Sequence, residues 1–386
     1  MDKEKLNNEK LNKDLFVPAK KDEAKREEIR RPSLSYWQDA WIRLRKNKGA
    51  IFGIALLIIV GILSLVGPHL NENDAYQQDL GHSRMPPRVP VLENISWLQL
   101  DGTKSDEFQA ATVEEAEQKA LLRFSIDDLE YVEFELVDDG TGSEPATVVG
   151  HFDVYAEQDM DEIYYWFGTD TLGRDIFTRV WTGTQVSLLI AFVAAALDMI
   201  IGVAYGGISA YYGGRVDNVM QRFIEILIGI PNLVVVILMI MILEPGVISI
   251  IIALTITGWT GMARIVRGQV LKLKNQEFIL ASRTLGSSNT RILSKHLIPN
   301  TLGMIIINTM FTIPAAIFFE AFLSFIGLGL QSPEASLGTL INDGFKSLQT
   351  NPHIMIFPAI VISLIMIGFN ILADGLRDAL DPKMRK

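Results

Sequence analysis

The sequence contains no cysteine and only five histidines, and these shortages limit its chemistry. Without cysteine there is no disulfide framework and no thiolate metal or redox site. The histidines are scattered, with no pair at the spacing of metal ligands. The motifs G-x-x-x-x-G-K-[ST], H-E-x-x-H and G-x-S-x-G are also absent. We therefore expect no phosphate-binding loop, no zinc-binding metalloprotease helix and no nucleophile elbow of a hydrolase. We therefore expect a protein that is not an enzyme and binds no metal or cofactor itself.

Long apolar runs, by contrast, are abundant. A run of about 18 or more apolar residues can cross the hydrocarbon core of a bilayer as one helix. Six stretches qualify, at 49–67, 186–212, 223–243, 247–263, 302–330 and 354–373. The fold class that we expect is an all-α polytopic membrane protein with six transmembrane helices.

Charge is distributed unevenly and predicts the orientation of these helices. Residues 70–181 hold 25 Asp and Glu against 7 Lys and Arg, whereas 264–295 hold seven basic residues and a single acid, Glu277. Lysine and arginine near helix ends favour the cytoplasmic side. The basic N-terminal region, the 264–295 segment and the basic C-terminal tail should thus be cytoplasmic, and the acidic segment extracytoplasmic. Six spans place both termini in the cytoplasm, which agrees with this distribution.

The same patterns divide the chain into segments. We expect a disordered cytoplasmic tail, because residues 1–32 are charged and poor in apolar side chains, and then an amphipathic helix at the membrane interface. The apolar face of that helix would hold Leu34, Trp37, Trp41 and Leu44, and a soluble helix packed on a partner is the alternative. In order, the segments are the tail at 1–32, the interfacial helix at 33–48, the first transmembrane helix at 49–68, an extracytoplasmic domain at 69–164, and a core at 165–386 with helices 2–6 and a cytoplasmic loop at 271–300.

The extracytoplasmic segment reads as a small α+β insertion between the first two transmembrane helices. A helix is expected at 108–124 and strands at 131–137 and 146–155, with the turn-like DDGTGSEP between the strands. After it, Asp170, Arg174 and Asp175 can form an ion network where the chain enters the second span.

Polar residues and prolines within the apolar runs mark a candidate path. Polar groups in a span usually face a bundle interior or a wet path, and prolines such as Pro231 and Pro358 remove helix hydrogen bonds and favour kinks. The candidate path residues are Asn308, Pro314, Glu320 and Asn370. A plain packed bundle is the alternative.

The segment EFILASRTLGSSNTRILSKHLIPN, from Glu277 to Asn300, is long and basic for a loop between membrane helices. It predicts two short helices at an angle, because Gly286 suits the position after a helix C-terminus and Ser287 or Ser288 can cap the next helix. Phe278, Ile279, Ala281 and Leu285 would form an exposed apolar side, which needs a partner groove. A helix lying flat on lipid headgroups is the alternative.

Here the residues resemble a known family. Glu277, Ala281, Gly286, Ile292 and Pro299 are similar to the "EAA" loop of importer-type ABC transporter permeases. The runs FGTDTLGRDIF at 167–177, FFEAFLSFIGLGL at 318–330 and ADGLRDALDP at 373–382 resemble the oligopeptide, dipeptide and nickel branch, most closely its second (C-type) oligopeptide subunit.

The resemblance implies the importer-type permease fold and a role as the membrane subunit of an ATP-driven oligopeptide importer in a bacterial plasma membrane. It implies a sister permease, two ATPase subunits that bind ATP and Mg, and an extracellular solute-binding protein as partners, a peptide as substrate, and no nucleic acid. A nickel or other small-solute importer, or an ion-driven secondary transporter, is the alternative. The implied ATPase-coupling residues are Glu277, Ala281, Ser282, Gly286, Ile292, His296 and Pro299, and the implied outer-face motif is Gly168, Asp170, Gly173, Arg174 and Asp175.

Three positions depart from the family pattern. Ser282 stands where a second alanine is usual, and Tyr165 and Leu337 stand where His and Trp are expected. The insertion at 70–164 is also longer than usual, so the family implies no role for it.

Overall fold

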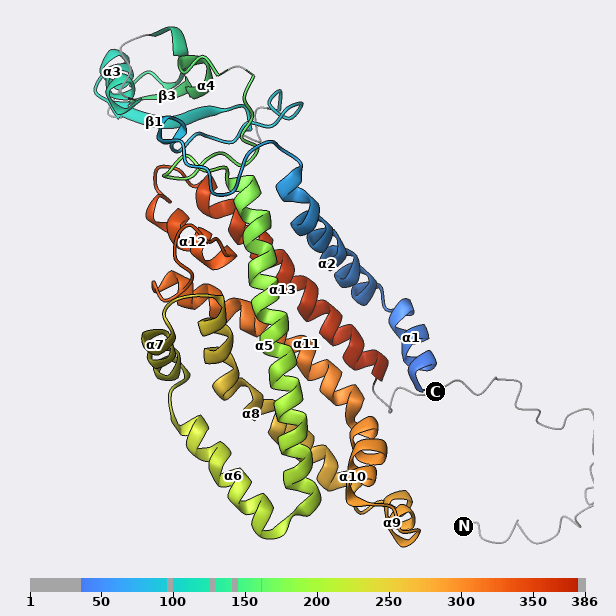
Figure 1. The fold of residues 1–386 in the computed structure, drawn as a ribbon. Coiled ribbons are helices and arrows are strands. Elements are labelled where there is room, and N and C mark those ends of the chain that lie inside the picture. The colour runs from blue at the N-terminus through green and yellow to red at the C-terminus, as the bar shows by residue number, and fades with distance from the viewer. Residues whose placement is uncertain (1–35, 96–99, 125–128, 141–144, 161, 381–386) are drawn as a thin grey trace, which may run out of the picture.

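The computed structural model describes residues 36–95, 100–124, 129–140, 145–160 and 162–380, which form a long helical bundle with a small sheet at one end (Figure 1). The predicted disordered tail at 1–32 and the basic tail at 381–386 lie outside the described residues. The main elements in chain order are α1 (Tyr36–Lys46), α2 (Lys48–Val66), β1 (Thr103–Ala110), α3 (Val113–Phe124), β2 (Val132–Asp138), β3 (Ala146–Asp153), α4 (Val154–Glu157), α5 (Ile176–Tyr212), α6 (Gly214–Gly229), α7 (Asn232–Leu243), α8 (Val247–Leu273), α9 (Glu277–Thr284), α10 (Asn289–Arg291), the π-helical turn η7 (Ile292–Leu297), α11 (Ile298–Phe325), α12 (Leu337–Lys346) and α13 (His353–Leu380).

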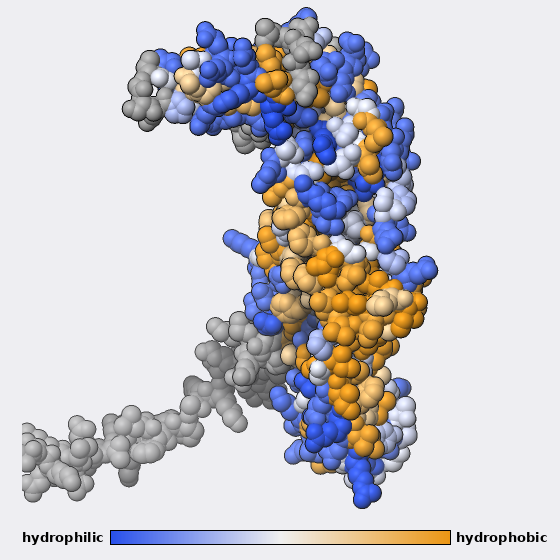
Figure 2. All heavy atoms as spheres, turned by 90° about the vertical axis from the view of Figure 1, so that its left-hand side faces the viewer, coloured by the Kyte–Doolittle hydropathy of each residue, from blue (hydrophilic) through white to orange (hydrophobic). Residues whose placement is uncertain are grey.

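Within the described residues, five helices are long and apolar enough to cross a membrane, namely α2, α5, α8, α11 and α13. Helices α6 and α7 pass the same test only as a pair, and they are bent by 81° at a short break that contains Pro231. The number of spans is therefore five, or six if the bent pair is one broken span. An apolar band crosses the middle of the molecule between polar ends, as Figure 2 shows.

Helix α5 runs through the whole bundle and packs closely on α8. It begins at Ile176, ten residues before the apolar run at 186, because Asp175 caps it by accepting a hydrogen bond from the Thr178 backbone N–H (2.8 Å). Gly202 and Gly206 lie against α8, and a Cβ added to Gly206 would overlap the backbone of Ala263. Small residues let helix backbones approach each other in a membrane, so these glycines set the spacing of the two helices.

Helix α2 lies along α13 through a similar contact (Figure 1). A Cβ on Gly53 would lie 2.9 Å from the carbonyl oxygen of Gly368. The two helix backbones are therefore in close contact at Gly53, with no room for a larger side chain there. Leu44 of α1 is buried beside Ala379, near the C-terminal end of α13.

The predicted apolar face of the 33–48 helix is divided in the structure. Leu44 points into the protein, whereas Trp37 and Trp41 are 48% and 51% exposed. The guanidinium of Arg45 lies 4.8 Å from the centre of the Trp41 ring. Leu34, the fourth residue of the predicted face, lies outside the described residues. Of the other three, Leu44 packs beside Ala379 of α13, and the two tryptophans stay exposed.

The sheet has the order β1-β3-β2, and both pairings are antiparallel. Strands β2 and β3 lie close to the stretches expected at 131–137 and 146–155. The expected helix at 108–124 is divided, since Phe108 belongs to β1 and α3 begins at Val113. Phe124 of α3 contacts both Phe108 and Phe152, and this packing holds α3 on the sheet.

Helix α12 has no counterpart among the expected elements. It begins with a capping box, in which Ser336 Oγ accepts from the Thr339 N–H (3.1 Å) and Thr339 Oγ1 accepts from the Ser336 N–H (2.9 Å). The S-x-x-T pattern in the sequence is a short-range signal for such a start, although the flanking residues are not apolar enough to mark a span.

We predict that Gly206→Ala destabilises the protein while Gly268→Ala does not. The new methyl group at position 206 meets the α8 backbone, whereas a Cβ at position 268 meets nothing within 4 Å. Overpacking costs about 1–3 kcal/mol, and alanine at an open helical site gains about 0.5–1 kcal/mol over glycine. Thermal unfolding of the purified protein in detergent measures both changes. Equal shifts in the two variants would show that the α5–α8 spacing is not constrained at Gly206.

Candidate functional site

The segment after α8 turns through a sharp corner at Gly286. This residue has φ of +79°, a left-handed conformation that strains residues with a side chain. The Ser287 N–H donates to the Ser282 carbonyl (3.1 Å) and the Gly286 N–H donates to the Arg283 carbonyl (3.0 Å). This pair of bonds is the Schellman motif, and it ends α9 with a defined geometry.

A second helical unit follows the corner directly. Ser288 caps it by accepting a hydrogen bond from the Arg291 N–H (3.4 Å). The chain then passes through the π-helical turn Ile292–Leu297 into α11, with Pro299 in the first turn of that helix. The predicted cap at Ser287 or Ser288 is thus formed by Ser288, and the second unit is continuous with α11.

Buried side chains hold the corner onto the ends of the long helices. Ile279, Ile292 and Leu297 are fully buried in one cluster with Tyr211 of α5 and Val266 of α8. In addition, the Tyr211 hydroxyl donates to Asn289 Oδ1 (2.7 Å). A movement of α5 or α8 therefore reaches the corner through packed atoms.

The outer side of the corner is apolar and exposed. Phe278 and Leu280 are each 45% exposed and Leu285 is 86% exposed. The expectation that Ile279 belongs to this exposed side is wrong, because its side chain points into the bundle. We name Phe278, Leu280 and Leu285 the apolar ridge.

The structure places the seven predicted coupling residues at different depths. Glu277, Ala281, Gly286 and Pro299 are exposed, Ser282 and His296 are half-buried, and Ile292 is buried. Among them, Gly286 and Ser282 shape the corner, whereas Ile292 anchors it.

A bidentate ion pair joins α8 to α6. Arg267 of α8 donates to both carboxylate oxygens of Asp217 in α6, over 2.7 and 2.6 Å. Ser209 Oγ of α5 also donates to Asp217 (2.5 Å). A bidentate arginine pair is geometrically specific, so this contact fixes α6 against α5 and α8.

At the sheet end, Asp170 is the centre of a buried charge network. Its carboxylate accepts from Arg174 Nε (2.7 Å) and from the backbone N–H of Leu172 (2.8 Å), and Arg179 Nε lies 3.5 Å away. Arg174 also donates to Ser332 Oγ in the loop before α12 (3.3 Å). The network thus joins Asp170 to the predicted Arg174 and to Arg179, which the sequence analysis did not select. Asp175, the third predicted member, bonds to Thr178 and Asn71 instead.

Backbone contacts explain the two glycines of this motif. Gly168 and Gly173 have φ of +76° and +71°, and a Cβ on Gly173 would overlap the backbone of Asp79. Asp175 caps α5 and accepts a further hydrogen bond from Asn71 Nδ2 (3.0 Å). The motif therefore binds the chain that follows α2 to the start of α5.

Tyr165 and Leu337, which depart from the family pattern, both have defined contacts. The Tyr165 hydroxyl shares a hydrogen bond with His82 Nδ1 (2.8 Å). Burial, and then the nearby carboxylates of Asp175 and Asp79, raise the pKa of Tyr165 to about 12, so the hydroxyl keeps its proton at neutral pH. Leu337 is fully buried, and its backbone N–H donates to Ser187 Oγ (3.1 Å).

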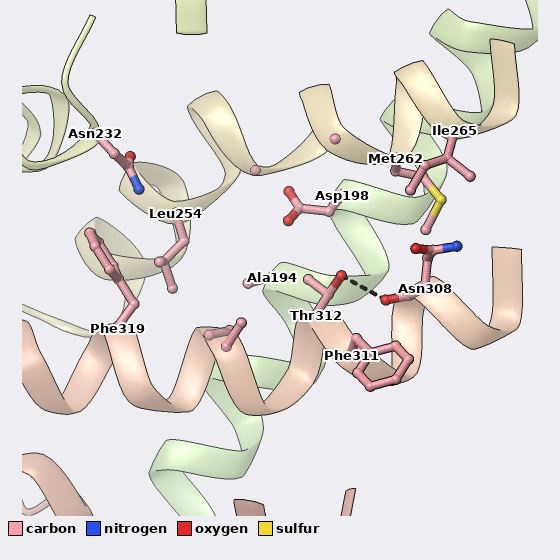
Figure 3. Close-up of a pocket in the computed structure, with 14 residues that line it drawn as sticks. Ala194, Asp198, Asn232, Leu254, Met262, Ile265, Asn308, Phe311, Thr312 and Phe319 are labelled. Carbon is pink, nitrogen blue, oxygen red and sulfur yellow. Dashed lines mark hydrogen bonds between the residues drawn. The ribbon is translucent and has the colours of Figure 1, made fainter. Parts of the chain in front are cut away.

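A cavity of about 410 Å³ lies in the middle of the bundle, between α5, α7, α8 and α11 (Figure 3). Its polar lining residues are Asp198, Asn232, Asn308 and Thr312. Asn308 is the one of the four candidate path residues that lines this cavity. Asp198 is an acid within the apolar run at 186–212, and its approach to Asn232 and Thr312 depends on helix packing.

The other three candidate path residues lie elsewhere. Glu320 is fully buried, and it accepts hydrogen bonds from Ser187 Oγ (3.1 Å) and Ser324 Oγ (2.9 Å). Pro314 is buried in α11, and Asn370 is exposed on α13. In this structure Glu320 joins helices α5 and α11 rather than facing the cavity.

Two parts of the chain match known protein families. Residues 199–386 match the family described as "Binding-protein-dependent transport system inner membrane component". Residues 35–87 match the "N-terminal TM domain of oligopeptide transport permease C". The three strands of the sheet, between Thr103 and Asp153, lie between these two matches in the sequence.

Similar proteins also occur among curated relatives. The chain is 40% identical to the dipeptide transport system permease protein of Bacillus subtilis, over 96% of this chain and 93% of that relative. It is 38% identical to the oligopeptide transport system permease protein of the same bacterium, over 97% and 98% of the two chains. The oligopeptide permease protein of Haemophilus influenzae is 45% identical over 58% of this chain and 72% of that relative.

We predict that Asp170→Asn strongly destabilises the protein. The substitution leaves Arg174 and Arg179, which are about 3% and 1% exposed, without their counter-charge. Breaking a buried ion pair costs about 3–5 kcal/mol. The midpoint of thermal unfolding measures the loss.

Asp374→Asn is the matched control, because Asp374 pairs with Arg377 at 3.5 Å and both side chains are more than half exposed. Such a pair contributes about 0–1 kcal/mol. If both variants unfolded at the wild-type temperature, Asp170 would not stabilise the sheet end of the bundle.

Proposed function

Because the chain belongs to the family of oligopeptide and dipeptide transport system permeases, we propose that it forms half of the translocation path of an ATP-driven peptide importer. It is a multi-pass plasma membrane protein. The identity of 38–40% extends over almost the full length of two such relatives, so the proposal covers the whole chain rather than one motif.

The observation that carries the proposal is the corner at Gly286 with its apolar ridge. A rigid corner that exposes Phe278, Leu280 and Leu285 suits insertion into a groove of another protein. We propose that this groove belongs to an ATPase subunit that binds ATP and Mg. Since Ile279 and Ile292 connect the corner to α5 and α8, closure of the ATPases would move those helices.

The proposed orientation follows from charge. The loop at 271–300 and the N-terminus are cytoplasmic, the sheet segment at 69–164 is extracytoplasmic, and α6 with α7 forms one broken span, which makes six. The exposed Trp37 and Trp41 with the nearby Arg45 support a position of α1 at the membrane interface. This orientation places the outer-face motif around Asp170 beside an extracellular solute-binding protein.

A second permease is needed to complete the path. A peptide carries charged termini, and a buried unpaired charge is too costly to cross lipid unaided. The central cavity supplies polar side chains from α5, α7 and α11. We propose that a sister permease encloses this cavity from the other side, with two ATPase subunits beneath the pair.

We predict that Gly286→Pro abolishes peptide uptake and the stimulation of ATP hydrolysis by the peptide-loaded receptor, while the chain still inserts in the membrane. Proline fixes φ near −65° and has no N–H, so it removes the bond to Arg283 and destroys the corner. Uptake and ATPase activity of the complex reconstituted in vesicles measure the effect, and the expected loss is at least tenfold.

Gly286→Asn is the matched control, because asparagine tolerates the left-handed conformation and keeps its N–H. We expect near-normal uptake for this variant. Wild-type coupling in Gly286→Pro, or uptake by the wild-type vesicles without any ATPase subunit, would contradict the proposed role of the corner.

We also predict that the sheet segment contributes to seating the solute-binding protein. Thr103 and Asp153 are opposite each other in the β1–β3 register, so a short Asn-Gly turn can join them in place of residues 104–152. We expect weaker receptor binding and slower uptake in this deletion. Its control is the unfolding midpoint, which shows whether the bundle remains intact. Unchanged receptor affinity and uptake in a folded deletion would reject this role.

A further inference from the structure

Asp198 is a buried acid that faces the central cavity. It lies on α5 and is 6% exposed, and its carboxylate points between α8 and α11 (Figure 3). The cavity volume of about 410 Å³ falls within the range of small-molecule sites, roughly 300–1,000 Å³. The geometry therefore combines a charged group with space for a ligand.

The position of the carboxylate depends on a glycine in the facing helix. A Cβ added to Gly258 of α8 would overlap both carboxylate oxygens of Asp198. Any larger residue at position 258 would push the carboxylate away from its present place. Nevertheless, Asp198 Oδ1 is buried and has no hydrogen-bond partner in the described part of the chain.

The neutral polar groups around the cavity differ from Asp198 in this respect. Asn232 Oδ1 accepts from Thr257 Oγ1 (2.7 Å), and Asn308 Nδ2 donates to the Met304 carbonyl (2.7 Å). Thr312 Oγ1 donates to the Asn308 carbonyl (3.0 Å). These side chains bond to their own helices or to a neighbouring one, whereas the Asp198 carboxylate keeps acceptor capacity directed to the cavity.

The chemistry of the lining selects the ligand class. Among the described residues that line this cavity, Asp198 is the only charged one. A carboxylate inside a membrane protein is costly unless it pairs with a cation. Calcium and magnesium take about six or more oxygen ligands, which one carboxylate and two amides do not provide. An ammonium group, with three N–H donors and a positive charge, suits a single carboxylate in a wide cavity.

We propose that Asp198 binds an ammonium group of the peptide, its protonated amino terminus or a lysine side chain, as the peptide passes through the bundle. The inference rests on the proposed function, since it names a contact along the peptide path. It gives the path a fixed point of recognition that is separate from the receptor.

The test compares a free-amine peptide with its N-acetylated counterpart, both without lysine. Uptake is measured in vesicles that contain the full transport complex, with the receptor saturated by each peptide so that receptor affinity does not enter. We expect the wild type to take up the free-amine peptide roughly tenfold faster, the effect of one hydrogen bond to a charged group. Asp198→Asn keeps the shape and removes the charge, so the ratio should fall to about one.

Glu225→Gln is the control, since it also removes an acid from the bundle. Glu225 forms an exposed pair with Arg222 and does not line the cavity, so the wild-type ratio should persist. An Asp198→Asn variant that slows both peptides by the same factor would assign Asp198 a purely structural role and overturn the inference. Dependence of the ratio on sodium or potassium, with choline as replacement, would assign the site to an inorganic cation instead.

The wild-type measurement decides the matter even if Asp198→Asn does not fold. A wild-type ratio near one overturns the inference and leaves the proposed function intact, because both peptides are still imported. A wild-type complex that imports neither peptide overturns the proposed function itself.

Discussion

The close contact of α5 with α8 is the constraint on which the other features depend. Gly202 and Gly206 bring the two backbones together. In the same helix contact, Gly258 of α8 leaves room for the Asp198 carboxylate of α5. One helix, α5, therefore carries the cap at Asp175, the acid of the cavity and the anchor of the corner at Tyr211. At about 1.5 Å per residue, its 37 residues span roughly 55 Å.

Such a helix can transmit movement because both of its ends are fixed to other elements. At the sheet end, the buried charges around Asp170 bind its first turn to the loop before α12. At the other end, Ile279 and Ile292 pack against it. The break between α6 and α7 at Pro231 is different, since the 81° bend removes helical continuity there. In the proposed importer, the rigid α5–α8 pair would move as a unit and the break would absorb the change.

Several parts of this arrangement could be predicted from local sequence. Gly286 and Ser288 mark a helix end and a helix start through backbone rules that involve only neighbouring residues, and both are found in those positions. The same holds for five of the long apolar helices, whereas the apolar run at 223–243 is broken at Pro231. Local sequence patterns predict less well which side chains are buried, because burial depends on how the helices pack. Ile279 and Phe278 are adjacent apolar residues on a short helix, and only the position of α5 and α8 determines which one is buried.

Sequence alone thus determined the apolar helices, the turn at Gly286 and the resemblance to a transport family, because these depend on composition, short spacing and motif. Tertiary structure decided which polar groups meet. Glu320 and Asp198 are both acids in apolar runs, yet Glu320 is satisfied by Ser187 and Ser324 while Asp198 faces a cavity. The reason is physical, since the partner of a buried charge is set by the helix that packs against it, and that helix lies far away in the sequence.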